Sequence, residues 1–102
     1  MTNLKKLTEL SLNDNNISDI GVLKNLKNLT WVALYSNNIS NISVFKNLTK
    51  LTEIDLHNNS ISDATPLHGL KQLKALYIIE GNNLSDAQIA DLRAALPNTS
   101  IN

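Results

Sequence analysis

The feature that most constrains the fold of this chain is a repeat with a period of 22 residues. Leu7, Leu29, Leu51 and Leu73 open four units. Apolar residues follow three and five positions later in each unit, and in the first three units an Asn follows eight positions after the opening Leu. A fixed period of this length indicates a stack of similar structural units, because one unit is too small to bury its own apolar side chains.

The spacing within a unit predicts a short strand followed by a chain reversal. Leu10 and Leu12 alternate with polar residues, which places both on the buried face of a strand. The repeated Asn, found at Asn15, Asn37 and Asn59, can bond main-chain groups that the irregular reversal leaves unpaired. The later apolar positions of each unit then return along the opposite side as tight turns of 3₁₀ type.

The repeated positions exclude a set of unrelated helices and resemble a known family. Unrelated amphipathic helices do not explain the pattern, because helical periodicity would not restart every 22 residues and the Asn-Asn-Ile-Ser blocks would break each helix. The sequence resembles the leucine-rich-repeat family, in particular the 22-residue class typified by bacterial internalins. One stretch that closely resembles an internalin repeat is Leu51–Leu67, Leu-Thr-Glu-Ile-Asp-Leu-His-Asn-Asn-Ser-Ile-Ser-Asp-Ala-Thr-Pro-Leu.

This resemblance covers nearly the whole chain and implies a fold of the α/β class. The expected architecture is a leucine-rich-repeat solenoid with short parallel strands on the concave face, tight 3₁₀-type turns on the convex face and a C-terminal capping helix. The resemblance is specific for the fold but says little about function, because the repeat motif encodes only the scaffold.

The fourth unit departs from the pattern by one extra residue. Asn82 therefore takes the position of the repeated Asn, and Gly81 supplies the backbone freedom that the insertion needs. Ser85 and Gln88, three residues apart, predict a capping box at the start of a helix. Apolar residues at helical spacing follow, and Pro97 ends the helix.

The chain thus divides into leucine-rich repeats over residues 1–84 and a C-terminal cap over residues 85–102, which holds this helix and a short strand containing Ile101. The N-terminal end of the sequence shows no such cap. Met1 and Leu4 match the repeat positions of Leu23 and Leu26, so the sequence begins partway through a repeat. Either the chain is the C-terminal piece of a longer array, or weak self-association covers the open N-terminal edge. The first alternative is favoured.

Alternate strand residues are expected to face outward on the concave side. The only Trp and both Tyr fall at such positions, and every charge there is acidic, whereas the lysines fall in return segments and loop edges. Adjacent parallel strands lie about 4.8 Å apart, so Trp31 is expected beside Glu53 and Tyr35 beside His57. Exposed aromatic residues within a polar rim are typical of protein recognition sites. The predicted partner-binding residues are Trp31, Tyr35, Glu53, Asp55, His57, Tyr77 and Glu80.

Such a face suits a protein partner that presents basic groups, through ion pairs and cation–π contacts. The sequence therefore predicts a protein-binding module that is part of a bacterial internalin-like protein. The alternative is a structural or self-associating solenoid with no independent ligand. In that case the aromatic residues only favour strands and the carboxylates only solvate the face.

An enzymatic function is not expected. Asp55 and His57 share one face and could form an acid–base pair or two metal ligands. No cysteine, suitably placed serine or third ligand accompanies them, and the three glycines are too scattered to form a phosphate-binding loop. We therefore interpret Asp55 and His57 as surface residues and expect no cofactor.

Charge and hydropathy argue against binding to nucleic acid or anionic lipid and against membrane insertion. Nine Lys and Arg balance nine Asp and Glu, so bulk charge does not favour binding to nucleic acid or anionic lipid. No apolar run is long enough for membrane insertion, and the first seven residues have no apolar core of a signal peptide. The lack of cysteine does not decide the compartment, whereas the family resemblance implies a secreted or cell-surface protein.

Overall fold

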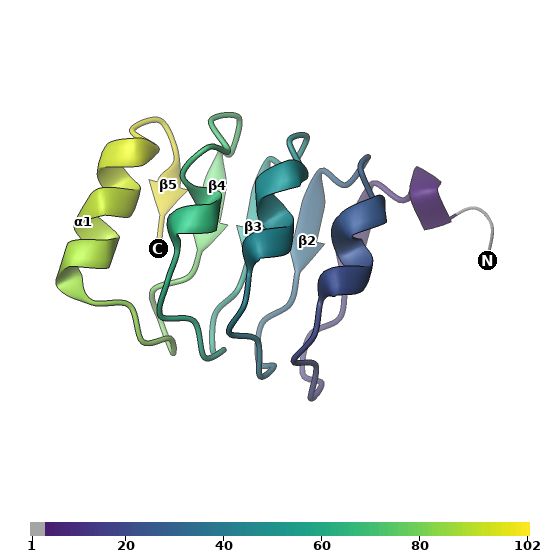
Figure 1. Ribbon diagram of the computed structural model, residues 1–102, viewed down its shortest axis with the longest axis horizontal. Coiled ribbons are helices and arrows are strands. Elements are labelled where there is room, and N and C mark those ends of the chain that lie inside the picture. The colour runs from purple at the N-terminus through teal and green to yellow at the C-terminus, as the bar shows by residue number, and fades with distance from the viewer. Residues whose placement is uncertain (1–3) are drawn as a thin grey trace.

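The computed structural model describes residues 4–102, which wind through successive coils with one short strand in each (Figure 1). All strands are parallel, and they form a single sheet in chain order. The strands are β1 (Glu9–Ser11), β2 (Trp31–Ala33), β3 (Glu53–Asp55), β4 (Ala75–Tyr77) and β5 (Ser100–Ile101). The predicted sheet is therefore confirmed, and its outward side is called the concave face below.

Helical segments line the opposite, convex side, as Figure 1 shows. Four are single turns or short stretches of 3₁₀ helix, and the last coil carries an α-helix in their place. They are η1 (Leu4–Lys6), η2 (Gly21–Asn25), η3 (Ser43–Asn47), η4 (Thr65–Leu67) and α1 (Asp86–Ala95). The predicted 3₁₀ turns and the C-terminal helix are thus both present.

A side-chain oxygen two residues upstream starts three of the 3₁₀ helices. In each case it accepts a hydrogen bond from the first main-chain N–H of the helix, a group that has no partner within the helix itself. The pairs are Asp19 with Gly21 at 2.9 Å, Asn41 with Ser43 at 3.0 Å and Asp63 with Thr65 at 2.9 Å. Thr65 also lowers the pKa of Asp63. The hydrogen bond from its main-chain N–H has the larger effect and that from its hydroxyl the smaller, and both favour the ionised carboxylate.

The core lies between the sheet and the convex segments and is built from the repeated apolar positions. Leu34 and Leu56, which hold the same position in successive coils, are completely buried. Phe45 replaces a Leu at another repeated position and is the completely buried residue of η3. The first coil is less protected, and its equivalent residue Leu12 keeps 38% of its surface exposed.

The repeated asparagines form a hydrogen-bonded ladder through this core. The Asn59 amide nitrogen donates to the main-chain oxygen of Leu34 in the preceding coil at 3.0 Å, and to that of Leu56 in its own coil at 3.1 Å. Its side-chain oxygen accepts from the N–H of Ile39 at 3.0 Å. Asn37 repeats the pattern one coil earlier. These two asparagines are the only polar residues buried in the described part of the chain.

The residue immediately before each ladder Asn has a left-handed backbone. The φ angles are 58° at Asp14, 60° at Ser36, 57° at Asn58 and 77° at Gly81. Only the glycine among these was anticipated from the sequence. The tight reversal requires the conformation in every coil, and Asp and Asn tolerate it better than most residues.

The fourth coil absorbs its extra residue as predicted. Asn82 takes the ladder position, donating to the main-chain oxygens of Leu56 at 2.8 Å and Ile78 at 2.9 Å. Gly81 cannot carry a side chain there, since a Cβ atom would lie 2.7 Å from the Cα of Asn58 in the preceding coil. Backbone conformation and close packing therefore both select glycine.

The predicted capping box of α1 forms only in part. The Ser85 hydroxyl accepts from the N–H of Gln88 at 3.1 Å, as an N-cap should. The Gln88 side chain does not return to Ser85. Its oxygen accepts instead from the N–H of Ala64 at 3.0 Å, which ties the helix to the preceding coil. A hydrogen bond to the preceding coil thus replaces one of the two local hydrogen bonds of the capping box.

The ladder leads to a prediction about stability. We expect Asn37→Ala and Asn59→Ala each to lower the free energy of unfolding by about 1–3 kcal/mol, because each strands buried main-chain groups. Urea denaturation checks this. Asn38→Ala is the matched control, since Asn38 is exposed, and it should change stability little. Equal losses at all three positions would contradict the role of the ladder. Asn58 is no control, because its left-handed backbone favours Asn over Ala.

The glycines offer a second test of the fold. Gly81→Ala should destabilise the protein by about 1–3 kcal/mol, through a strained positive φ and a clash with Asn58. Gly69→Ala should be neutral or stabilise by up to about 1 kcal/mol, since no atom lies within 4 Å of the added Cβ and the φ of Gly69 is not positive. Thermal melts of both variants decide the matter, and an equal response would be evidence against this account of Gly81.

Candidate functional site

The parallel register stacks equivalent side chains of successive strands into rows across the concave face. One row contains Glu9, Trp31, Glu53, Ala75 and Ser100. The next row contains Ser11, Ala33, Asp55 and Tyr77. Because the side chains of a parallel sheet alternate between its two faces, both rows point away from the core. Ala33 is nevertheless buried, since its methyl group does not reach past its larger neighbours in the row.

Main-chain hydrogen bonds define a third row, where the strands end. Asp14 N–H donates to the oxygen of Tyr35 at 3.0 Å, and Ser36 N–H donates to that of His57 at 2.9 Å. In the next coil the equivalent acceptor is Glu80, at 3.0 Å from the N–H of Asn58. Tyr35, His57 and Glu80 are therefore neighbours along the sheet, despite the extra residue that precedes Glu80. The arrangement places Tyr35 beside His57 as the repeat predicts.

Trp31 is held in place by a carboxylate of the adjacent strand. Its indole Nε1 donates to the Oε2 atom of Glu53 at 3.2 Å. Both side chains are half-buried, so the indole keeps an accessible surface while its position is restricted. This contact follows from the register, which pairs Trp31 with Glu53.

His57 is the centre of a second group of contacts. Its ring lies edge-on to that of Tyr77, with the ring centroids 5.5 Å apart and the planes at 74°. Its Nδ1 atom is 3.7 Å from the Oδ1 atom of Asp55, which also accepts from the main-chain N–H of His57 at 3.2 Å. Its Nε2 atom lies 3.4 Å from the main-chain oxygen of Asn102.

Sequence reasoning missed the contact to Asn102. The two residues are 45 positions apart in the chain and meet only because the segment after α1 returns to pair with β4 as strand β5. The same oxygen accepts from the N–H groups of Ile78 and Ile79, so it is part of the sheet. A cap strand has no 22-residue repeat to mark its register, and the sequence pattern therefore carries no indication of this neighbour.

The electrostatic character of the concave face is acidic. Its outward strand positions carry Glu9, Glu53 and Asp55, Glu80 follows in the third row, and no Lys or Arg of the described residues occupies any of these rows. Asp55 and His57 are too loosely placed for a strong pair at 3.7 Å. Within residues 4–102 no three His, Cys, Asp or Glu side chains are grouped so that they could hold a metal ion.

Models of known protein families match most of the chain. The model described as Leucine Rich repeats (2 copies) matches residues 27–67 and 49–98, and the model described as Leucine Rich Repeat matches residues 6–26. The chain belongs to the leucine-rich-repeat family. The resemblance that the 22-residue period indicated is thereby confirmed. No relative among curated proteins matches this leucine-rich-repeat chain.

Solved structures of bacterial leucine-rich-repeat proteins are similar in fold. An internalin from Listeria monocytogenes has a TM-score of 0.88 and 33% sequence identity over 97% of this chain. A leucine-rich-repeat protein from Leptospira interrogans has a TM-score of 0.85 and 29% identity over 94% of this chain. Internalin C2 of Listeria monocytogenes has a TM-score of 0.70 and 30% identity over 86% of this chain. The leucine-rich repeats are thus of internalin type.

The present chain corresponds to only part of these proteins. It spans 28% of the first internalin, 25% of the Leptospira protein and 38% of internalin C2. In residues 4–102 no helix of the leucine-rich-repeat protein is long and apolar enough to cross a membrane.

Proposed function

We propose that this leucine-rich-repeat chain is a protein-binding module, and that its concave face binds a partner that presents basic groups. The observation that carries the proposal is the gathering of the only Trp, both Tyr and four carboxylates in adjacent rows of one face. Aromatic anchors with charged neighbours are typical of the few residues that supply most of the affinity in protein interfaces.

The local geometry supports binding by Trp31 and Tyr35. Both side chains are half-buried, so a partner can cover the remaining surface without the protein having to reorganise. The bond from Trp31 to Glu53 already restricts the indole, which lowers the rotamer entropy that complex formation would cost. Glu53 keeps a second carboxylate oxygen for a partner's Lys or Arg.

The comparisons support this class of function rather than catalysis. Leucine-rich-repeat proteins of internalin type are in general protein-interaction modules, and the repeat itself encodes only the scaffold. We therefore assign no enzymatic role to Asp55 and His57, which contribute to the contact surface together with Tyr77. By the same analogy, the module belongs to a secreted or cell-surface bacterial protein.

The concave face is tested by alanine substitution. A partner is first identified by affinity capture and is then purified for calorimetric titration. Trp31→Ala and Tyr35→Ala should each weaken its binding by about 2 kcal/mol or more, because rigid aromatic residues bury large areas on binding. Neutral variants of Glu53, Asp55 and Glu80 should mainly slow association and reduce its salt dependence.

Lys24→Gln and Lys46→Gln are the controls, since these residues lie in the last turns of η2 and η3, away from the concave face. They should leave the affinity unchanged. A purified partner that the Trp31/Tyr35 double variant still binds, but the lysine variants do not, would place the site on the wrong side of the solenoid. Melting curves of all variants separate loss of binding from loss of fold.

A second candidate function, self-association, is favoured by the N-terminal edge of the solenoid. Leu12 in the first coil is 38% exposed, and Val22 in η2 is 74% exposed. Their equivalents one coil later, Leu34 and Val44, are packed against or within the core. Met1 lies outside the described residues, and the side chain of Leu4 is not described either. We propose that a second copy of the chain covers this edge, because joining two such edges removes their apolar surface from water.

Sedimentation velocity over a range of concentrations tests this candidate. The wild type should associate weakly, and Leu12→Lys together with Val22→Lys should make the protein more monomeric, because a charge on the edge opposes its burial. Arg93→Ala, in α1 at the other end, is the control and should have no effect. A wild type that stays monomeric at millimolar concentration would exclude this role for the edge.

A further inference from the structure

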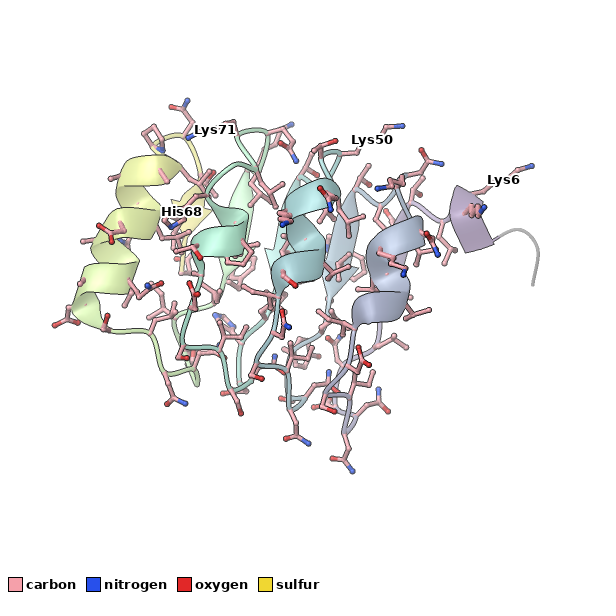
Figure 2. The ribbon with its side chains drawn as sticks, viewed as in Figure 1. Lys6, Lys50, His68 and Lys71 are labelled. Carbon is pink, nitrogen blue, oxygen red and sulfur yellow. The ribbon has the colours of Figure 1, made fainter. Side chains whose placement is uncertain are left out.

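All eight lysines of the chain lie along one edge of the solenoid. They fall in the last turn of η1, η2 and η3 and in the segments that lead from the convex side to the next strand, at positions 5–6, 24–27, 46–50 and 71–74, which are called the crossings below. Figure 2 shows Lys6, Lys50 and Lys71 along this edge, over three of the four coils. Each crossing contributes two lysines, and every one of them is exposed. This set is called the lysine edge below.

No acidic residue neutralises the lysine edge. The four crossings contain no Asp or Glu, and within residues 4–102 no lysine lies within ion-pair distance of a carboxylate. Where ordered partners exist they are uncharged: the Lys50 ammonium donates to the Asn28 side-chain oxygen at 2.8 Å, and that of Lys71 to the main-chain oxygen of Ala95. These bonds position the ammonium groups without cancelling their charge. The net charge of zero therefore conceals a strongly polarised molecule.

The carboxylates that balance the lysines lie elsewhere. Those outside the concave face either follow the strands at the opposite edge, at Asp14, Asp19 and Asp63, or lie in α1, at Asp86 and Asp91. The second coil has none there, since residues 36–42 contain no acid. The acidic edge is thus interrupted, whereas the lysine edge is continuous over four coils.

Lysines repeat along the solenoid axis with the spacing of the coils. Lys5, Lys27 and Lys71 hold the same repeat position, with Thr49 in the remaining coil, and Lys24 and Lys46 share another. Adjacent strands lie about 4.8 Å apart, so successive coils place lysines along the edge at intervals of that order. A linear polymer laid along the edge could pair one anionic group with each coil.

We propose that the lysine edge binds a sulfated linear polysaccharide. Such a chain carries anionic groups at intervals comparable to the coil spacing, and each group that binds an ammonium releases condensed counterions. The polymer is preferred to single-stranded nucleic acid, because Trp31 and both Tyr lie on the concave face and Phe45 is buried, so the lysine edge has no aromatic residue on which bases could stack. A second copy of the chain fits less well, because its acidic edge is interrupted.

Calorimetric titration with a size-defined heparin oligosaccharide tests the proposal, at low and at near-physiological salt. The wild type should bind with an affinity that falls steeply with salt. The triple variant Lys24→Gln, Lys27→Gln, Lys46→Gln should bind at least about tenfold more weakly, with the slope of log affinity against log salt reduced by about 2–3. Within residues 4–102 only Lys50 and Lys71 among the lysines donate side-chain hydrogen bonds, so the triple variant should keep its fold, as circular dichroism can verify.

A charge-matched variant separates the lysine edge from bulk charge. Ser18→Glu, Ser40→Glu and Ser62→Glu change the net charge by the same amount, at exposed equivalent positions of three coils on the opposite edge. Their affinity for heparin should stay within about twofold of that of the wild type. Equal loss in both triple variants would overturn the proposal, because it would show that net charge alone drives binding. Absence of wild-type binding at low salt would overturn it as well.

A gain-of-function variant provides an independent test of the lysine edge. Thr49→Lys places a lysine at the one member of the repeat position 5, 27, 49 and 71 that lacks it, and it should strengthen heparin binding several-fold. Ser40→Lys adds the same charge on the opposite edge and should not. Oligothymidylate and vesicles of anionic lipid are the competing probes. If either binds more tightly than heparin and loses affinity in the lysine triple variant, the edge recognises a different class of polyanion and the proposal fails.

Discussion

The asparagine ladder is the interaction on which the rest of this structure depends. Each coil reverses direction inside the protein, where main-chain N–H and C=O groups cannot be hydrated, and the reversal is too irregular for those groups to pair with each other. One amide side chain per coil satisfies two carbonyls and one N–H, and it links each coil to the one before it. This asparagine is kept even in the fourth coil, which has one extra residue, because the amide must reach the same place in each of these coils.

A constant period has a functional consequence, since it arranges any given position of the repeat into a straight row. Positions that face inward are restricted to apolar residues of suitable size, whereas those that face outward are unconstrained by folding. The concave rows collect the aromatic and acidic residues, and the crossings collect the lysines. Two surfaces of opposite chemistry therefore coexist on one small protein, and a net charge of zero conceals both.

Most of the fold could be predicted from the sequence, because a repeated pattern averages out local ambiguity. The strand positions, the ladder residues, the extra residue before Asn82 and the C-terminal helix all follow from the period and from capping rules. Local rules were less reliable where coils interact. The Gln88 side chain bonds the preceding coil rather than its own helix start, and Ser36 adopts a left-handed backbone that its residue type does not favour. In both cases a tertiary constraint outweighs a local preference.

The sequence by itself determined which residues face outward on the sheet, because alternation along a strand and the 22-residue period are properties of the chain alone. Only the tertiary structure decided which outward residues touch and how. The bond from Trp31 to Glu53 and the contacts of His57 with Tyr77 and Asn102 depend on interstrand distance and side-chain rotamers, which no single repeat specifies. Asn102 shows the limit most clearly. It reaches the concave face through a cap strand outside the repeat, and so its register is set by packing rather than by periodicity.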